Sequence, residues 1–246
     1  MSKKLSYSVG LDVGSKENYA HILFRTDSQD IKTKASTKFA NTAAGFARFS
    51  KWISGHIKEE VPVIYVMEAT GVYHERLCDY LYDQGKKVAV IVPSMTKNYA
   101  RSLGKQSKND KADSQILAQL GLERQLKLWQ PFSPKTRELR DLTRQYENMQ
   151  VLKNQLGNQL HALNSGRGGL ELVKKQLEEL SASVGVQISV LNKEILKVIR
   201  TDEKLQAKWK NVKDICGIGE LSFAVIVAET NGFDLFKNER QLTKYA

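Results

Sequence analysis

The sequence predicts a mixed α/β domain followed by a long pair of helices, and three observations predict it. Up to about residue 130, short apolar runs alternate with segments of helical periodicity. From residue 139 onward the apolar positions follow a heptad spacing instead. Pro131 and Pro134 separate the two patterns, so the boundary between two structural regions is expected there.

The first three strands are expected to form a meander. Residues 5–13 and 17–25 have strand-like patterning and are separated by a short turn at 14–16, and residues 32–39 form a third segment of this kind. Strands joined by such short connections pair as hairpins. The first part of the sheet is therefore predicted to be antiparallel.

The pattern then alternates between helices and buried strands. Phe46, Phe49 and Ile53 recur at helical spacing, with Asn41 or Thr42 as the expected cap. Continuous apolar runs are typical of strands buried on both faces, which need helical crossovers and so lie parallel. The strands expected on this ground are 61–69 and 86–92, and the helices are 73–84, 95–103 and 110–125. Together these predict a mixed sheet with helices on both faces.

The second half predicts an antiparallel helical hairpin. Apolar residues recur at spacings of three and four, interrupted where Lys153 takes an expected apolar position. Residues 165–169 (SGRGG) break the pattern, and a second helical stretch follows. A layer of a helical bundle and a dimerisation arm both remain open. The expected domains are 1–130, a helical coiled-coil segment at 131–205, and the start of a further helical domain at 206–246.

Charge and composition favour a nucleic-acid partner. The net charge is +11 and the pI is near 9.5. Residues 97–144 hold eleven Lys and Arg against five Asp and Glu. A basic protein with a small-molecule substrate is the alternative. No apolar run is long enough for a membrane span, no signal peptide is recognisable, and Cys78 and Cys216 fit no metal spacing, so a cytoplasmic, nucleoid-associated protein is expected.

Four carboxylates are the expected catalytic and metal-binding residues: Asp12, Glu68, Asp110 and Asp113. Each has an ordinary alternative, because Asp12 suits a turn, Glu68 a strand end, and the last two a helix start. Asp12 and Glu68 nevertheless end neighbouring strands, and Asp110 and Asp113 share one face of a helix. Four converging carboxylates would repel one another unless cations neutralise them. Two Mg²⁺ ions with oxygen ligands, acting on a phosphodiester, are therefore expected.

Basic residues beside these acids are expected to contact nucleic acid. Lys97, Arg101, Lys105 and Lys108 recur at spacings of four, four and three, and they form one stripe if a helix continues through Gly104. Lys16 and Lys111 complete this expected set. A solvated charged face is the alternative. Residues 215–219 (ICGIG) could hold a phosphate, as in a helix-hairpin-helix, or could form a simple tight turn.

Four segments in this order carry a specific resemblance: LDVGSKENYAHI, VMEATGVYHERL, VPSMTKNYARSLGKQSKNDKADSQILAQL and ICGIGELSFAVIVAETNGFDLFKNERQLTKYA. Together they resemble the DEDD-type insertion-sequence transposases, which are relatives of the Piv-type DNA invertases. The resemblance covers nearly the whole chain. In many relatives the third motif reads closer to KTDxxDA, whereas KNDKADS here differs at Asn109 and Ser114 and keeps both acids.

The resemblance implies a RuvC-like first domain with an RNase H fold and the four acidic ligands Asp12, Glu68, Asp110 and Asp113. It also implies DNA recombination guided by a structured RNA, a dimer or tetramer, and a second domain with a nucleophilic serine. The sequence ends before that serine is expected, and Ser222 does not match its context. A truncated form of the family's chain is therefore expected.

Two other functions fit parts of the sequence. GLDVGS is similar to the phosphate loop of ATP-dependent sugar or acetate kinases, which share a related fold, although no second glycine-rich phosphate loop follows a later strand. A non-catalytic nucleic-acid-binding scaffold would explain the charge and the heptads alone. A DNA recombinase remains the leading hypothesis.

Overall fold

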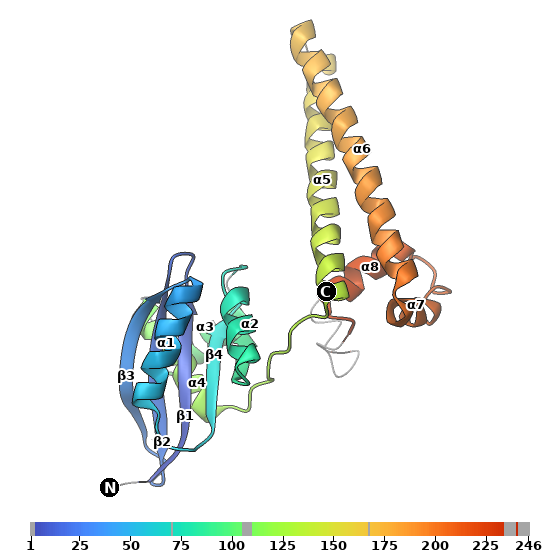
Figure 1. Cartoon of the computed structure of the whole chain (residues 1–246). Helices are drawn as coiled ribbons and strands as arrows, with labels where there is room; N and C mark the ends of the chain where they lie inside the picture. Colours follow the sequence, from blue (N-terminus) through green and yellow to red (C-terminus); the bar gives the residue numbers. More distant parts are fainter. Residues whose placement is uncertain (1–2, 70, 105–109, 167, 234–239, 241–246) are drawn as a thin grey trace. The chain divides into compact units, whose positions relative to one another are not determined.

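The computed structural model describes residues 3–69, 71–104, 110–166, 168–233 and 240 (Figure 1). The chain folds into two compact units, Met1–Pro131 and Phe132–Ala246. The first unit is built on a sheet and the second is helical. Each unit has its own hydrophobic core.

The first unit contains a five-stranded mixed sheet in the order β3-β2-β1-β4-β5. Strands β1, β2 and β3 form the predicted antiparallel meander, and β4 and β5 lie parallel to β1. This is the strand order of an RNase H fold, and it confirms the predicted mixed sheet. The strands are β1 (Lys4–Val13), β2 (Glu17–Thr26), β3 (Ile31–Ala40), β4 (Val63–Glu68) and β5 (Lys87–Ile91).

Helices cover both faces of this sheet, as predicted. Helices α1 (Ala43–His56) and α2 (Glu75–Asp83) bury their apolar sides with Val9 and Leu11 on one face. Helices α3 (Pro93–Ser102) and α4 (Asp110–Glu123) pack with Val66 and Ile91 on the other. Of the two expected caps for α1, Thr42 is the one used, and its side chain accepts a hydrogen bond from the backbone N–H of Gly45 at 3.2 Å.

Helix α4 crosses β1 at unusually short range because Gly10 has no side chain. A Cβ at Gly10 would lie 1.9 Å from the carbonyl oxygen of Ser114 and 2.4 Å from the backbone nitrogen of Ala118. Gly121 makes a similar approach, since its Cβ would lie 2.3 Å from the hydroxyl of Ser8. These two glycines fix both the height of α4 above the sheet and its direction along β1.

The register of the edge strand β3 changes at a β-bulge. Leu23 pairs with Thr33, whereas Ile22, the residue before Leu23 in β2, pairs with Ala35, which leaves Lys34 as the extra residue. Every later pair is offset by one position relative to a regular hairpin. The bulge therefore decides which side chains of β3 face α4.

The second unit is the predicted helical hairpin with two short helices packed at its base. Helix α5 (Pro134–Ser165) and helix α6 (Glu171–Thr201) lie side by side (Figure 1). Leu139, Ile195 and Phe223 belong to the core at the base, which includes residues of α7 (Glu203–Lys210) and α8 (Glu220–Glu229). Residues 215–219 lie between α7 and α8.

Lys153, at the interruption of the heptad pattern, lies opposite a glycine. A Cβ built on Gly185 of α6 would be 3.9 Å from the Lys153 ammonium nitrogen, which shows that the lysine side chain lies along the partner helix there. Among the described residues, no helix is long and apolar enough to cross a membrane.

Candidate active site

Two of the predicted carboxylates lie side by side at the carboxyl ends of parallel strands. Leu11 of β1 pairs with Met67 of β4, so the next position along places Asp12 beside Glu68. Neighbouring strands are about 4.8 Å apart. In open α/β sheets this end of the strands is where ligands bind.

The same row continues across the sheet in the other direction. Asp12 pairs with Tyr19 of β2, and Tyr19 pairs with Lys38 of β3. We call Glu68, Asp12, Tyr19 and Lys38 the cross-sheet row. It carries two carboxylates, a phenol and an ammonium group on four adjacent strands.

The members of the cross-sheet row lie on the face covered by α4. Side chains alternate along a strand, and Leu11 and Val13 point into the core beneath α1 and α2. Asp12 and Gly10 therefore lie on the opposite face, where Gly10 touches α4. Glu68 shares its face with Val66, which packs against α4. Directly paired residues of adjacent strands share a face, so Tyr19 and Lys38 lie there too.

Helix α4 runs antiparallel to β1 and delivers Asp113 to the same end of the sheet. Gly121 lies beside Ser8, and Ser114 lies beside Gly10, so the helix start is directed toward Asp12. Asp113 stands on the same side of the helix as Leu117 and Leu120, which pack with Val66 and Ile91 of β4 and β5. Asp12, Glu68 and Asp113 are all half-buried, so each remains accessible to solvent.

The loops at this end of the sheet are joined by one side chain. The amide nitrogen of Asn41 donates hydrogen bonds to the carbonyl oxygens of Gly14, at 2.9 Å, and of Tyr73, at 3.1 Å. Gly14 follows Asp12 in the β1–β2 turn, and Tyr73 lies in the segment after Glu68. Asn41 therefore holds the two loops that follow the paired carboxylates in a fixed relation.

The donor set suits a hard divalent cation, because carboxylate oxygens are the preferred ligands of Mg²⁺. Within the described side chains, no group of three or more His, Cys, Asp and Glu is close enough to hold a metal ion. The fourth predicted ligand, Asp110, begins α4, but its side chain lies outside the described residues. The described part of the site is thus the pair Asp12 and Glu68, with Asp113 on the helix above.

The predicted basic stripe is not continuous. Lys97 and Arg101 are exposed one turn apart on α3, as predicted. The helix does not continue through Gly104, however, because it ends at Ser102 and Gly104 adopts φ = +66°, a conformation that glycine allows without steric cost. Lys105, Lys108 and the side chain of Lys111 lie outside the described residues. Lys16 is exposed in the β1–β2 turn.

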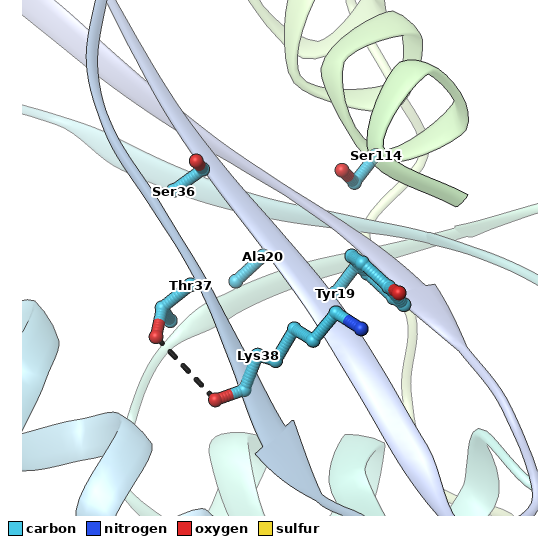
Figure 2. Close-up of a pocket in the computed structure, with 6 residues that line it drawn as sticks. All are labelled: Tyr19, Ala20, Ser36, Thr37, Lys38 and Ser114. Atoms are coloured by element: carbon cyan, nitrogen blue, oxygen red, sulfur yellow. Dashed lines mark hydrogen bonds between the residues drawn. The ribbon is translucent and has the colours of Figure 1, made fainter. Parts of the chain in front are cut away.

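The structure adds a hollow beside the carboxylates that sequence reasoning missed (Figure 2). Its volume is about 240 Å³, and we call it the Lys38 hollow. It is lined by Tyr19, Ala20, Ser36, Thr37, Lys38 and Ser114. The ammonium nitrogen of Lys38 lies 4.4 Å from the centre of the Tyr19 ring. The position of the β1–β2 turn in the sequence would have been enough to pair Tyr19 with Asp12. The place of Lys38 beside Tyr19 depends on the bulge in β3.

Comparison with known proteins identifies the family. The model of the transposase family DEDD_Tnp_IS110 matches residues 9–164, which include Asp12, Glu68, Asp110 and Asp113. The chain belongs to this transposase family. The resemblance seen in the sequence motifs is thereby confirmed.

Two relatives and two solved structures are similar to this transposase-family chain. The pilin gene-inverting proteins of Moraxella bovis and Moraxella lacunata are each 26% identical over 210 residues. The match covers 85% of this chain and 63% of each relative, so the chain spans somewhat less than two thirds of their length. Thermus thermophilus RuvC has a TM-score of 0.36 at 10% identity, over 50% of this chain and 99% of that one. The fowlpox virus Holliday junction resolvase has a TM-score of 0.33 at 17% identity, over 47% and 95%.

Proposed function

We propose that the chain is a DNA recombinase that cleaves and exchanges DNA strands at the site formed by β1, β4 and α4. The observation that carries this proposal is the placement of Asp12 and Glu68 in one row, beneath the start of a helix that bears Asp113, in a member of a transposase family. Carboxylates placed close together repel one another, and such clusters are candidates for functional sites. Here three acidic residues from distant parts of the sequence lie at the same end of one face of the sheet.

The proposed role of these carboxylates is to hold divalent cations, two Mg²⁺ ions if Asp110 completes the set. Mg²⁺ held by these carboxylates would supply the positive charge that activates a nucleophile and stabilises the leaving oxygen of a phosphodiester. Asp12 and Glu68 are fixed by strand pairing, and Asp113 is positioned by the close contact of α4 with Gly10. The chain thus supplies oxygen ligands whose backbone positions are set before DNA binds.

Basic residues on the first unit would hold the DNA backbone next to these acids. Lys97 and Arg101 project from α3, and Lys16 from the turn that follows Asp12. Contacts of this kind position a nucleic acid without reading its sequence. Lys105, Lys108 and Lys111 belong to the same proposal on the basis of their sequence positions.

A structured guide RNA is the second proposed nucleic-acid ligand. The family resemblance motivates this part of the proposal, and the net charge of +11 supports it because one chain would have to neutralise two polyanions. The proposed test is competition. A guide RNA that binds this chain should displace labelled DNA only in part, since separate surfaces would be used, and complete displacement would count against two sites.

A homodimer or tetramer through the helical hairpin is the remaining part of the proposal. Several large apolar side chains on α5 and α6 are exposed in the single chain, including Val151, Leu172, Val186 and Val190. A long hairpin with apolar residues outside its own seam is typical of helices that associate further. Val186→Asp and Val190→Asp should therefore lower the molecular mass measured by light scattering, whereas an unchanged mass would refute this surface.

The test of the metal site uses Asp12→Asn and Asp113→Asn, with Asp27→Asn in the exposed β2–β3 turn as the matched control. The first two variants should lose Mg²⁺-dependent action on DNA, measured with guide RNA present. They should also lose the rise in melting temperature that Mg²⁺ gives to the unmodified chain. If both variants respond to Mg²⁺ as the control does, the carboxylates do not hold the metal.

A further inference from the structure

The cross-sheet row places a cation two strands away from the paired carboxylates. Lys38 lies on the edge strand β3, in register with Tyr19 and, through it, with Asp12. Its ammonium nitrogen does not stay above β3, because it lies 4.4 Å from the centre of the Tyr19 ring on β2. The positive charge is thus about one strand spacing from the strand that carries Asp12.

The Lys38 hollow has the chemistry of a phosphate subsite. Among the described residues, its lining carries one ammonium group and the hydroxyls of Tyr19, Ser36 and Ser114, and none of the six lining residues has a carboxylate (Figure 2). Thr37 pairs with Ala20, so its side chain lies on the other face of the sheet. Ammonium and hydroxyl groups are the usual partners of phosphate oxygens in nucleic-acid complexes. The ammonium group covers the Tyr19 ring, so this ring face is less suited to stacking with a base.

The ion pair that Lys38 makes in the structure does not prevent this role. Its ammonium nitrogen lies 3.8 Å from a carboxylate oxygen of Glu17, and the two side chains are 55% and 62% exposed. Exposed pairs of this kind contribute little to stability. A phosphate could therefore take the place of Glu17 at small cost.

We propose that Lys38, supported by the ring of Tyr19, binds a DNA backbone phosphate adjacent to the one cleaved at Asp12 and Glu68. The inference rests on the proposed function, since the cleaved phosphate is placed by the carboxylates. A DNA strand that crosses the cross-sheet row would have its reacting phosphate over Asp12 and a flanking phosphate over the Lys38 hollow. Lys38 is therefore a positioning residue that holds the DNA strand in line with the carboxylates.

The experiment compares Lys38→Ala, Lys38→Arg and the matched variant Lys32→Ala. Lys32 is also exposed on β3, but it pairs with Phe24, which packs in the core beneath α1, so it lies on the opposite face of the sheet. Each variant removes or keeps one positive charge on the same strand. Affinity for a fluorescein-labelled DNA duplex is measured by anisotropy over a range of NaCl concentrations in EDTA, and melting curves check folding.

When the logarithm of the affinity is plotted against the logarithm of the salt concentration, Lys38→Ala should make the slope shallower by about 0.9. This is the value for one lost phosphate contact on a duplex. Lys38→Arg should keep the slope, and Lys32→Ala should leave it nearly unchanged. In Mg²⁺-dependent cleavage, Lys38→Ala should raise KM for DNA about tenfold while changing kcat less. If Lys38→Ala and Lys32→Ala give equal slopes, the phosphate subsite does not exist.

Failure of this inference can be distinguished from failure of the proposed function. If Asp12→Asn abolishes cleavage and Lys38→Ala behaves as Lys32→Ala does, the carboxylate site stands and the subsite is refuted. If Asp12→Asn leaves cleavage intact, the metal site is refuted. The salt slope measured in EDTA still reports whether Lys38 contacts DNA, and an unchanged slope would then overturn both proposals.

Discussion

Replacing Gly10 by alanine should damage both the stability of the first unit and its activity. The new Cβ would lie 1.9 Å from the carbonyl oxygen of Ser114, whereas ordinary contact begins at 3.4 Å. Both atoms at the contact belong to backbone or are bonded directly to it, so no flexible side chain can move aside. Helix α4 would have to retreat by roughly 1.5 Å, the difference between those two distances.

The expected loss of stability in Gly10→Ala follows from the known cost of overpacking a core. Forced shifts of this kind cost about 1–3 kcal/mol, and we expect Gly10→Ala to lie near the upper value because backbone must move. A domain of this size loses about 3–5 °C of melting temperature per kcal/mol, so a fall of about 10 °C is expected. Since α4 carries Asp113, the same movement should lower the rate of DNA cleavage by about 100-fold.

The assay is thermal unfolding followed by circular dichroism, together with Mg²⁺-dependent DNA cleavage. Gly55→Ala is the matched control, because a Cβ there meets nothing within 4 Å and the residue lies in α1. Alanine is the better helix former, so this variant should be unchanged or more stable by up to about 1 kcal/mol. A Gly10→Ala chain that melts with the unmodified protein would refute the close crossing of α4 over β1.

Three further outcomes are expected. Hydrogen bonds from Arg144 hold the pKa of Glu229 below its ordinary value of 4.5, so Glu229→Gln should lower the free energy of unfolding by about 1 kcal/mol at pH 7. Urea unfolding curves should show this loss shrinking as the pH falls below 4.5, and a loss that persists at low pH would contradict the ion pair. Cys216 is exposed and Cys78 is buried with a raised pKa, so a thiol reagent should modify one cysteine per folded chain and both after denaturation. Thr42→Ala should destabilise the first unit by about 1 kcal/mol through loss of the α1 cap, and Thr42→Ser should restore most of it.

Much of the fold could be predicted because its signals are local. The apolar runs that became β4 and β5 and the helical periodicity of α1 follow from burial on particular faces. The neighbouring positions of Asp12 and Glu68 followed from strand order, since a meander followed by crossovers brings β1 beside β4. The interruption at Lys153 was visible in the heptads, whereas the proximity of its side chain to Gly185, thirty-two residues away in sequence, depends on how the two helices pair.

Two features could not be predicted because they depend on tertiary geometry. The end of α3 before Gly104 was ambiguous, since a glycine can continue a helix or terminate it in the left-handed conformation. Lys38 joins the row of Tyr19 only because Lys34 is bulged out, and no local sequence signal specifies that extra residue. Regular pairing from the β2–β3 turn would have placed Thr37 there instead.

The division of the chain at Pro131 and Phe132 has a consequence for every measurement of stability. Two separately cored units need not lose their structure in one cooperative event, so a heating curve of the whole chain can contain two transitions. Gly10→Ala should then shift one of them and Glu229→Gln the other. Each free energy belongs to the unit that holds the altered residue, and a single midpoint for the intact polypeptide would average over two independent equilibria.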